Sequence, residues 1–252
     1  MPGAFSDHRF WLGTRGTGFG RALADRGFSV WVLDPRGHGA SDRPGLAARW
    51  SFRDEIVHDV PAALRMAAGR RRAVLVGHSA GGAAVLAAIG ADPGLREKVA
   101  GVAVLATPSP RGGAARRSAA AFAAIVSRGL GRFPARLFRL GGEDEMGGVM
   151  AEWMGWNVRG SWRWKGGPDL LAALHPVPFP VFVAAGSGDR LFAPPSACRA
   201  LARQLGPNAR FAEFGRITGC SEDFGHAGLV VSRASRTEVW PALVDWIESV
   251  AG

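Results

Sequence analysis

The pattern of hydrophobic and polar positions along the chain alternates between segments typical of buried strands and segments typical of helices. Short apolar runs rich in Val and Ala, typical of buried strands, occupy 28–33, 73–77, 99–106, 180–185 and 209–214. Amphipathic or small-residue stretches that predict helices occupy 17–26, 51–68, 80–90, 194–205 and 237–250. Strands that alternate with helices in this way predict an α/β fold, with a mostly parallel sheet and helices on both of its faces.

This alternation stops between residues 110 and 172. The segment contains an Ala/Arg-rich helical pattern at 114–128, then Gly-rich and Trp-rich stretches with no convincing strand. Insertions at the carboxyl ends of parallel strands lie over the ligand site of such sheets. We therefore expect residues 1–109 and 173–252 to form an α/β core and residues 110–172 to form a helical cap.

Pro61 indicates that one of these predicted helices is irregular. It falls inside the predicted helix at 51–68, where its ring and its missing N–H favour a kink or a break.

Composition is that of a soluble globular protein, with 47% apolar and 21% charged residues among 252. The two cysteines, Cys198 and Cys220, make no disulfide framework and no metal-ligand spacing. No apolar run spans a bilayer and no secretory signal is visible at the N-terminus, so we expect a cytoplasmic protein. The net charge of +10 comes from scattered arginines without a nucleic-acid-binding motif, which favours a small-molecule ligand over nucleic acid.

The sequence Gly77-His78-Ser79-Ala80-Gly81 lies where a predicted strand becomes a predicted helix. A turn this sharp strains the residue at its tip and needs small neighbours, so the Ser79 oxygen becomes exposed above the sheet. The following helix directs its first N–H groups to the same place, and the Ala80 N–H is placed to stabilise an oxyanion. We interpret Ser79 as a nucleophile rather than a plain helix cap.

A serine nucleophile needs a base, and the base needs an acid that orients it. Asp189 directly follows one predicted strand, and His226 lies on a loop before the last helix. This gives the chain order Ser, Asp, His. Turn-forming and structural roles are the alternatives for Asp189 and His226, and Glu222 or Asp223 could serve as a substitute acid.

Four motifs together resemble the α/β-hydrolase family: GHSAG at 77–81, DPRGHGAS at 34–41, Gly188-Asp189 and Gly225-His226. The pattern is nearest to esterases and lipase-like hydrolases with a helical cap. The resemblance implies an acyl-enzyme mechanism that needs no metal or organic cofactor, acting on a carboxylic ester with an apolar acyl group. Thioesterase, amidase, peptidase or acyltransferase activity with the same residues is an alternative, as is a non-catalytic protein.

The chain departs from that family at its N-terminus. The family's second oxyanion donor follows a strand, whereas here the matching stretch is Met1 to Phe5, with Ala4 (or else Phe5) as the donor. We therefore expect the N-terminal strands of the sheet to be missing. Either the true start lies upstream, or the flanking strands close up and displace the loop.

Candidate residues for a substrate pocket come from the start of the chain, the serine motif and the cap. They are Phe5, His78, Phe122, Met150, Trp153 and Trp156. Pockets for small molecules are mostly apolar, but large aromatics at helical spacing are more often part of a core. Both interpretations remain open for the tryptophans.

Overall fold

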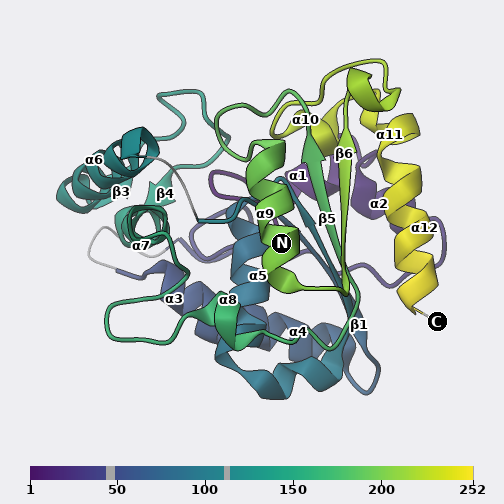
Figure 1. Cartoon of the computed structure of the whole chain (residues 1–252), viewed down its shortest axis with the longest axis horizontal. Coiled ribbons are helices and arrows are strands. Elements are labelled where there is room, and N and C mark those ends of the chain that lie inside the picture. The colour runs from purple at the N-terminus through teal and green to yellow at the C-terminus, as the bar shows by residue number, and fades with distance from the viewer. Residues whose placement is uncertain (44–48, 111–113, 252) are drawn as a thin grey trace.

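A four-stranded parallel sheet forms the centre of the computed structural model, which describes residues 1–43, 49–110 and 114–251 (Figure 1). The strands lie in the order β1-β2-β5-β6, and β2 pairs in parallel with β1 on one side and β5 on the other. Their bounds are β1 Ala73–His78, β2 Val99–Leu105, β5 Val181–Gly186 and β6 Ala209–Phe214. These four match predicted strands to within a residue or two, and the predicted α/β class is confirmed.

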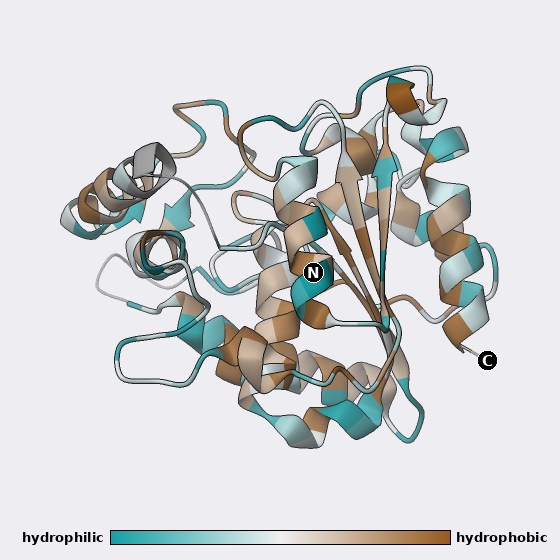
Figure 2. Cartoon of the chain, viewed as in Figure 1, coloured by the Kyte–Doolittle hydropathy of each residue, from teal (hydrophilic) through white to brown (hydrophobic). Residues whose placement is uncertain are grey.

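Helices cover both faces of this sheet (Figure 1). One face carries α4 (Val60–Ala68), α5 (Ala80–Ala91) and α9 (Pro195–Leu205), and the other carries α2 (Phe19–Ala24) and α12 (Trp240–Ala251). The remaining short helices of the core are α1 Arg9–Leu12, η2 Pro93–Lys98, α8 Leu170–Ala173, η3 Arg216–Thr218, α10 Gly228–Val231 and α11 Ser235–Glu238. Along the outer helices, hydrophobic residues alternate with hydrophilic ones, as on α12 (Figure 2).

Helix α5 is the exception, because it is apolar on every side. All residues from Ala80 to Gly90 are buried. Small side chains let neighbouring backbone approach it closely: a Cβ on Gly90 would lie 2.2 Å from the carbonyl oxygen of Leu170. The helix that begins at the serine motif is therefore buried at the centre of the core.

The predicted helix at 51–68 forms, with an irregular turn inside it. It begins as α3 (Phe52–Asp54), continues as the π-helical turn η1 (Glu55–Asp59) and ends as α4. Pro61 cannot donate a backbone hydrogen bond, and a π-turn just before it accommodates that loss without breaking the helix. The irregularity thus lies at residues 55–59, ahead of the predicted position.

The strand predicted at 28–33 is wrong, because this segment has no strand assignment. Within the described residues β1 pairs with one strand only, β2. On its other side the backbone of Met1 makes the contacts: its amino group donates to the Val76 carbonyl (2.6 Å) and its carbonyl accepts from His78 N (3.2 Å). Without a partner ladder, an alternating sequence does not become a strand, and Trp31 remains 58% exposed.

Residues of the predicted cap form two long helices, α6 (Ala114–Leu130) and α7 (Gly147–Arg159), which stand beside the core in Figure 1. Between them β3 (Arg132–Phe133) and β4 (Glu145–Met146) make an antiparallel pair that the sequence did not predict. Strands of two residues are too short to leave a periodic pattern. The cap boundaries stay a prediction, and residues 111–113 lie outside the described residues. None of the helices in the described residues combines the length and the hydrophobicity that a transmembrane span requires.

Candidate active site

Ser79 occupies a strained turn between β1 and α5. Its backbone has φ 53° and ψ −124°, a combination that residues with a side chain rarely adopt. The turn is tight enough that a Cβ on Gly77 would lie 2.5 Å from the Cα of Gly82. Two hydrogen bonds hold it: Ser79 N donates to the Leu105 carbonyl (2.9 Å), and Thr107 Oγ1 donates to the Ser79 carbonyl (3.0 Å). The predicted sharp turn is thus present, with its serine at the tip.

The His226 imidazole lies between the Ser79 hydroxyl and the Asp189 carboxylate. Its Nε2 is 2.9 Å from Ser79 Oγ, and its Nδ1 is 2.5 Å from Asp189 Oδ2. The His78 ring and the Phe192 ring pack against it, with centroids 4.7 and 5.0 Å away. The structure therefore brings together three side chains that are distant in the sequence, since His226 lies 37 residues after Asp189 and 147 residues after Ser79.

Asp189 is buried and fully hydrogen-bonded. Besides His226, its carboxylate accepts from the backbone N–H groups of Phe192 (3.0 Å) and Ala193 (3.1 Å). Burial alone would raise the pKa of Asp189, but its bonds to His226 and to these N–H groups outweigh burial and lower the pKa below its ordinary value. An ionised Asp189 accepts the Nδ1–H of His226 and leaves Nε2 facing Ser79. Asp223 instead accepts from Arg216 N (2.9 Å).

The first residues of the chain lie directly against the serine turn. A Cβ on Gly3 would lie 3.0 Å from the Cβ of Ser79, and one on Gly81 would lie 2.1 Å from the carbonyl oxygen of Pro2. Ala4, on this loop, and Ala80, at the start of α5, line one small cavity. The two predicted oxyanion donors are therefore neighbours in space.

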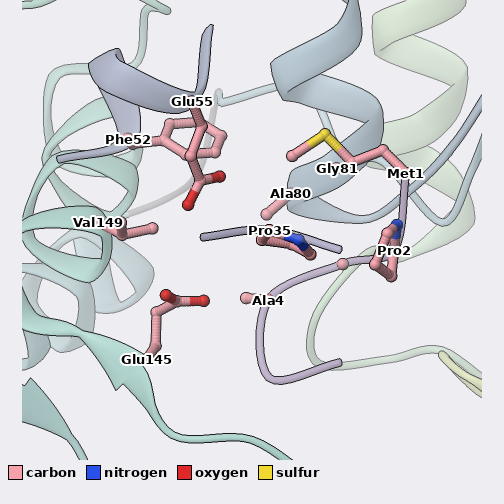
Figure 3. A pocket seen from close by; sticks show the side chains of 11 residues that line it. Met1, Pro2, Ala4, Pro35, Phe52, Glu55, Ala80, Gly81, Glu145 and Val149 are labelled. Carbon is pink, nitrogen blue, oxygen red and sulfur yellow. The ribbon is translucent and has the colours of Figure 1, made fainter. Parts of the chain in front are cut away.

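That cavity has a volume of about 10 Å³, room for roughly one water-sized group (Figure 3). Its lining is Met1, Pro2, Gly3, Ala4, Pro35, Phe52, Glu55, Ala80, Gly81, Glu145 and Val149. Figure 3 shows the carboxyl groups of Glu55 and Glu145 entering the same space from two elements, η1 and β4. They are 3% and 2% exposed, so two acids are buried beside the loop that carries Ala4.

Sequence reasoning missed this pair. Glu55 belongs to an amphipathic helix and Glu145 to the acidic run Glu143-Asp144-Glu145, and neither is part of a recognisable motif. Burial and the nearby charge of Glu145 raise the pKa of Glu55 well above its ordinary value.

Glu145 pairs with His38, whose Nε2 lies 3.4 Å from Glu145 Oε1. Burial opposes the charged imidazole, but Glu145 and the Ser6 carbonyl, 3.0 Å from Nδ1, raise the pKa of His38 to about 9. Glu145 therefore has a cationic partner, whereas Glu55 Oε1 has no hydrogen-bond partner among the described residues.

The predicted pocket residues lie elsewhere, and none lines this cavity as the structure describes it. Phe122 on α6 is 71% exposed, and the Phe5 ring stacks on Phe133, with centroids 5.5 Å apart. His78 is buried beneath His226, where its Nε2 donates to the His226 carbonyl (3.0 Å). Burial and the neighbouring His226 lower the pKa of His78 to about 3, which keeps it neutral.

The cap residues of that set are buried in the interior. Trp153 and Trp156 pack edge-on against Phe52, with centroids 5.4 and 5.2 Å away, and Met150 is 4% exposed. Their packing joins α7 to α3. No group of three or more His, Cys, Asp or Glu residues in the described ranges is arranged to hold a metal ion.

A parallel sheet flanked by helices, with a serine on a strained strand-to-helix turn, defines the class of α/β hydrolases. The chain belongs to the alpha/beta hydrolase family, whose profile matches residues 1–234. None of the proteins of curated function matches the sequence in a direct comparison.

Solved structures share the fold. An esterase from Thermogutta terrifontis is similar with a TM-score of 0.66 and 21% identity, over 100% of this chain and 89% of that one. A monoacylglycerol lipase from Paleococcus ferrophilus gives a TM-score of 0.66 and 18% identity, over 99% and 92%. A putative non-heme bromoperoxidase from Mycobacterium tuberculosis H37Rv gives 0.64 and 21%, over 100% and 91%. At these identities the likeness establishes the common fold.

Proposed function

We propose that this protein is a serine hydrolase that cleaves a carboxylic ester through an acyl-enzyme. The observation that carries the proposal is the position of the His226 imidazole, 2.9 Å from Ser79 Oγ and 2.5 Å from Asp189 Oδ2. A hydroxyl, an imidazole and a buried carboxylate in this order are the working parts of nucleophilic acyl transfer.

In the acylation step, Ser79 Oγ attacks the ester carbonyl carbon while His226 Nε2 takes the hydroxyl proton. The ester C–O bond then breaks, and His226 returns the proton to the departing alcohol. Asp189 keeps Nδ1 protonated and stabilises the imidazolium. The N–H groups of Ala80 and Ala4 bind the oxyanion, an interaction worth about 10²–10³ in rate for each donor.

Deacylation repeats these steps with water as the nucleophile. His226 removes a proton from the water, the acyl-enzyme collapses, and Ser79 recovers its proton. Every proton transfer passes through one imidazole, so activity depends on its fixed position. The Phe192 ring, 43% exposed and next to His226, offers an apolar surface to the acyl group.

A fluorophosphonate probe tests the nucleophile directly. We expect the wild type to be labelled and Ser79→Ala to be unlabelled, while Ser249→Ala, which removes an exposed hydroxyl bonded to the Trp246 carbonyl, labels normally. A series of p-nitrophenyl esters, acyl thioesters and acyl amides then ranks the bonds cleaved. Labelling that survives in Ser79→Ala, or a folded wild type that is never labelled, refutes the proposal.

A further inference from the structure

The cavity beside Ala4 and Ala80 contains a carboxyl group that the fold itself leaves unsatisfied. Glu55 is 3% exposed, and its Oε1 accepts no hydrogen bond from any described residue. A buried carboxyl oxygen without a partner costs stability, on the order of 1–3 kcal/mol or more if ionised. Such a group calls for an explanation, and a bound group that supplies the missing hydrogen bond is one.

Cations near Glu55 are already engaged. Arg36 makes two hydrogen bonds with Asp59, one of them at 2.7 Å, and His38 faces Glu145. The cavity is therefore lined by two carboxyl groups, of which Glu145 pairs with His38 behind it, and this leaves an excess of acceptor groups. A guest with N–H donors and positive charge complements this environment.

Cavity size limits that guest. A volume of about 10 Å³ suits a small group of roughly the size of water, such as a primary ammonium. The position also restricts it, because the same cavity is lined by Ala4 and Ala80, the proposed donors to the ester carbonyl oxygen. A group that fills the cavity must then be attached close to the carbonyl carbon.

We propose that Glu55, assisted by Glu145, binds a primary ammonium group on the acyl part of the substrate, so that the substrates are aminoacyl esters or amides. This inference rests on the serine hydrolase function proposed above and names its substrate class. Glu55 Oε1 accepts an N–H of the ammonium, and Glu145 on the opposite wall of the cavity contributes a second carboxylate (Figure 3).

The arrangement also suits the chemistry next to it. Burial and the charge of Glu145 raise the pKa of Glu55, which favours the neutral carboxyl in the empty cavity, and a neutral carboxyl does not repel a developing oxyanion. Binding of an ammonium favours the ionised carboxyl, and the Glu55 proton leaves to solvent. The resulting ion pair adds no net charge beside the oxyanion.

Alanine methyl ester and methyl isobutyrate make a matched pair of substrates, because the ammonium of one replaces a methyl of the other. An α-ammonium also activates an ester chemically, so the informative quantity is the change in the ratio of the two kcat/KM values on mutation. We expect Glu55→Gln to lower the ratio of alanine ester to isobutyrate at least tenfold. Glu143→Gln, a buried glutamate outside the cavity lining, leaves the ratio unchanged.

A binding measurement gives a readout that needs neither turnover nor a mutant. L-alaninamide raises the melting temperature of the wild type and of Ser79→Ala in a concentration-dependent way, whereas isobutyramide does not. A shift of equal size with both amides overturns the inference, as does an unchanged ratio in a folded Glu55→Gln.

The two proposals fail separately. Hydrolysis of both esters that depends on Ser79 but shows no effect of Glu55→Gln removes the ammonium site and leaves the serine hydrolase. Binding of alaninamide without fluorophosphonate labelling removes the serine hydrolase and leaves the ammonium site.

Discussion

Replacing Gly81 by alanine tests whether the first residues of the chain take part in catalysis. The added Cβ would lie 2.1 Å from the carbonyl oxygen of Pro2, 2.8 Å from its carbonyl carbon and 2.9 Å from the carbonyl oxygen of Met1. Ordinary contact begins at 3.4 Å, so the loop must withdraw from α5 by at least 3.4 − 2.1 = 1.3 Å. All three atoms belong to backbone, which cannot rotate away as a side chain can.

Ala4 moves with this loop, and an oxyanion donor displaced by more than 1 Å no longer reaches its oxygen. We therefore expect kcat of Gly81→Ala to fall about 10²–10³-fold with little change in KM. Stability changes less. Overpacking costs about 1–3 kcal/mol, and the better helix propensity of alanine returns up to about 1 kcal/mol.

Steady-state hydrolysis of a p-nitrophenyl ester gives kcat and KM, and thermal melting followed by circular dichroism checks the fold. Gly129→Ala is the matched control, because it is also a helical glycine and a Cβ there meets nothing within 4 Å. We expect that control to keep full activity. If Gly81→Ala is folded and its kcat stays within threefold of the wild type, the loop carries no oxyanion donor and the reasoning is wrong.

Three further changes address the acid, the buried histidine and the core. Asp189→Asn places an amide NH2 where three N–H donors converge and removes the charge behind His226, so we expect kcat to fall on the order of 10⁴; a loss under tenfold in the kinetic assay would contradict this. The pKa of His38, raised from 6.5 to about 9, means that its stabilisation is complete below pH 6.5 and is lost as pH rises through 9. Urea unfolding should show that the wild type loses up to about 3 kcal/mol of its free energy of unfolding across that pH window, whereas His38→Gln loses none. If the two proteins show the same pH dependence of stability, the prediction is wrong. Gly90→Ala brings a Cβ to 2.2 Å from the Leu170 carbonyl oxygen, so we expect a loss of about 1–3 kcal/mol in the same assay; unchanged stability would show that α8 yields freely.

The features that could be predicted from the sequence are those that depend on the local backbone conformation. The turn at Ser79 needs small residues on both sides, and the chain has Gly77 and Gly81 there. Asp189 could be predicted because it directly follows an apolar strand, and His226 because it lies on the loop after the last predicted strand, since parallel strands end at one edge. The positions of these residues follow from short stretches of chain.

Features that depend on a distant partner were not predictable in the same way. The stretch at 28–33 has a strand's pattern, yet the described residues offer it no ladder partner. The meeting of Glu55 with Glu145 joins a π-turn to a two-residue strand 90 positions away, and neither element leaves a periodic signal. The cap tryptophans were open to two interpretations because an aromatic stripe has the same spacing in a core and in a pocket. Packing against Phe52 puts Trp153 and Trp156 in the interior.

The burial of helix α5 also determines the order in which parts of the protein unfold. Residues 83–90 are buried within the core and donate their N–H groups to backbone hydrogen bonds, so we expect these amide hydrogens to exchange with deuterium only when the whole core opens. Ser79, the proposed nucleophile, thus directly precedes a helix that we expect to open last, whereas His226 lies on a loop at the surface. On warming, we therefore expect the loop that carries His226 to unfold locally first, while Ser79 keeps its strained backbone conformation until the whole domain unfolds.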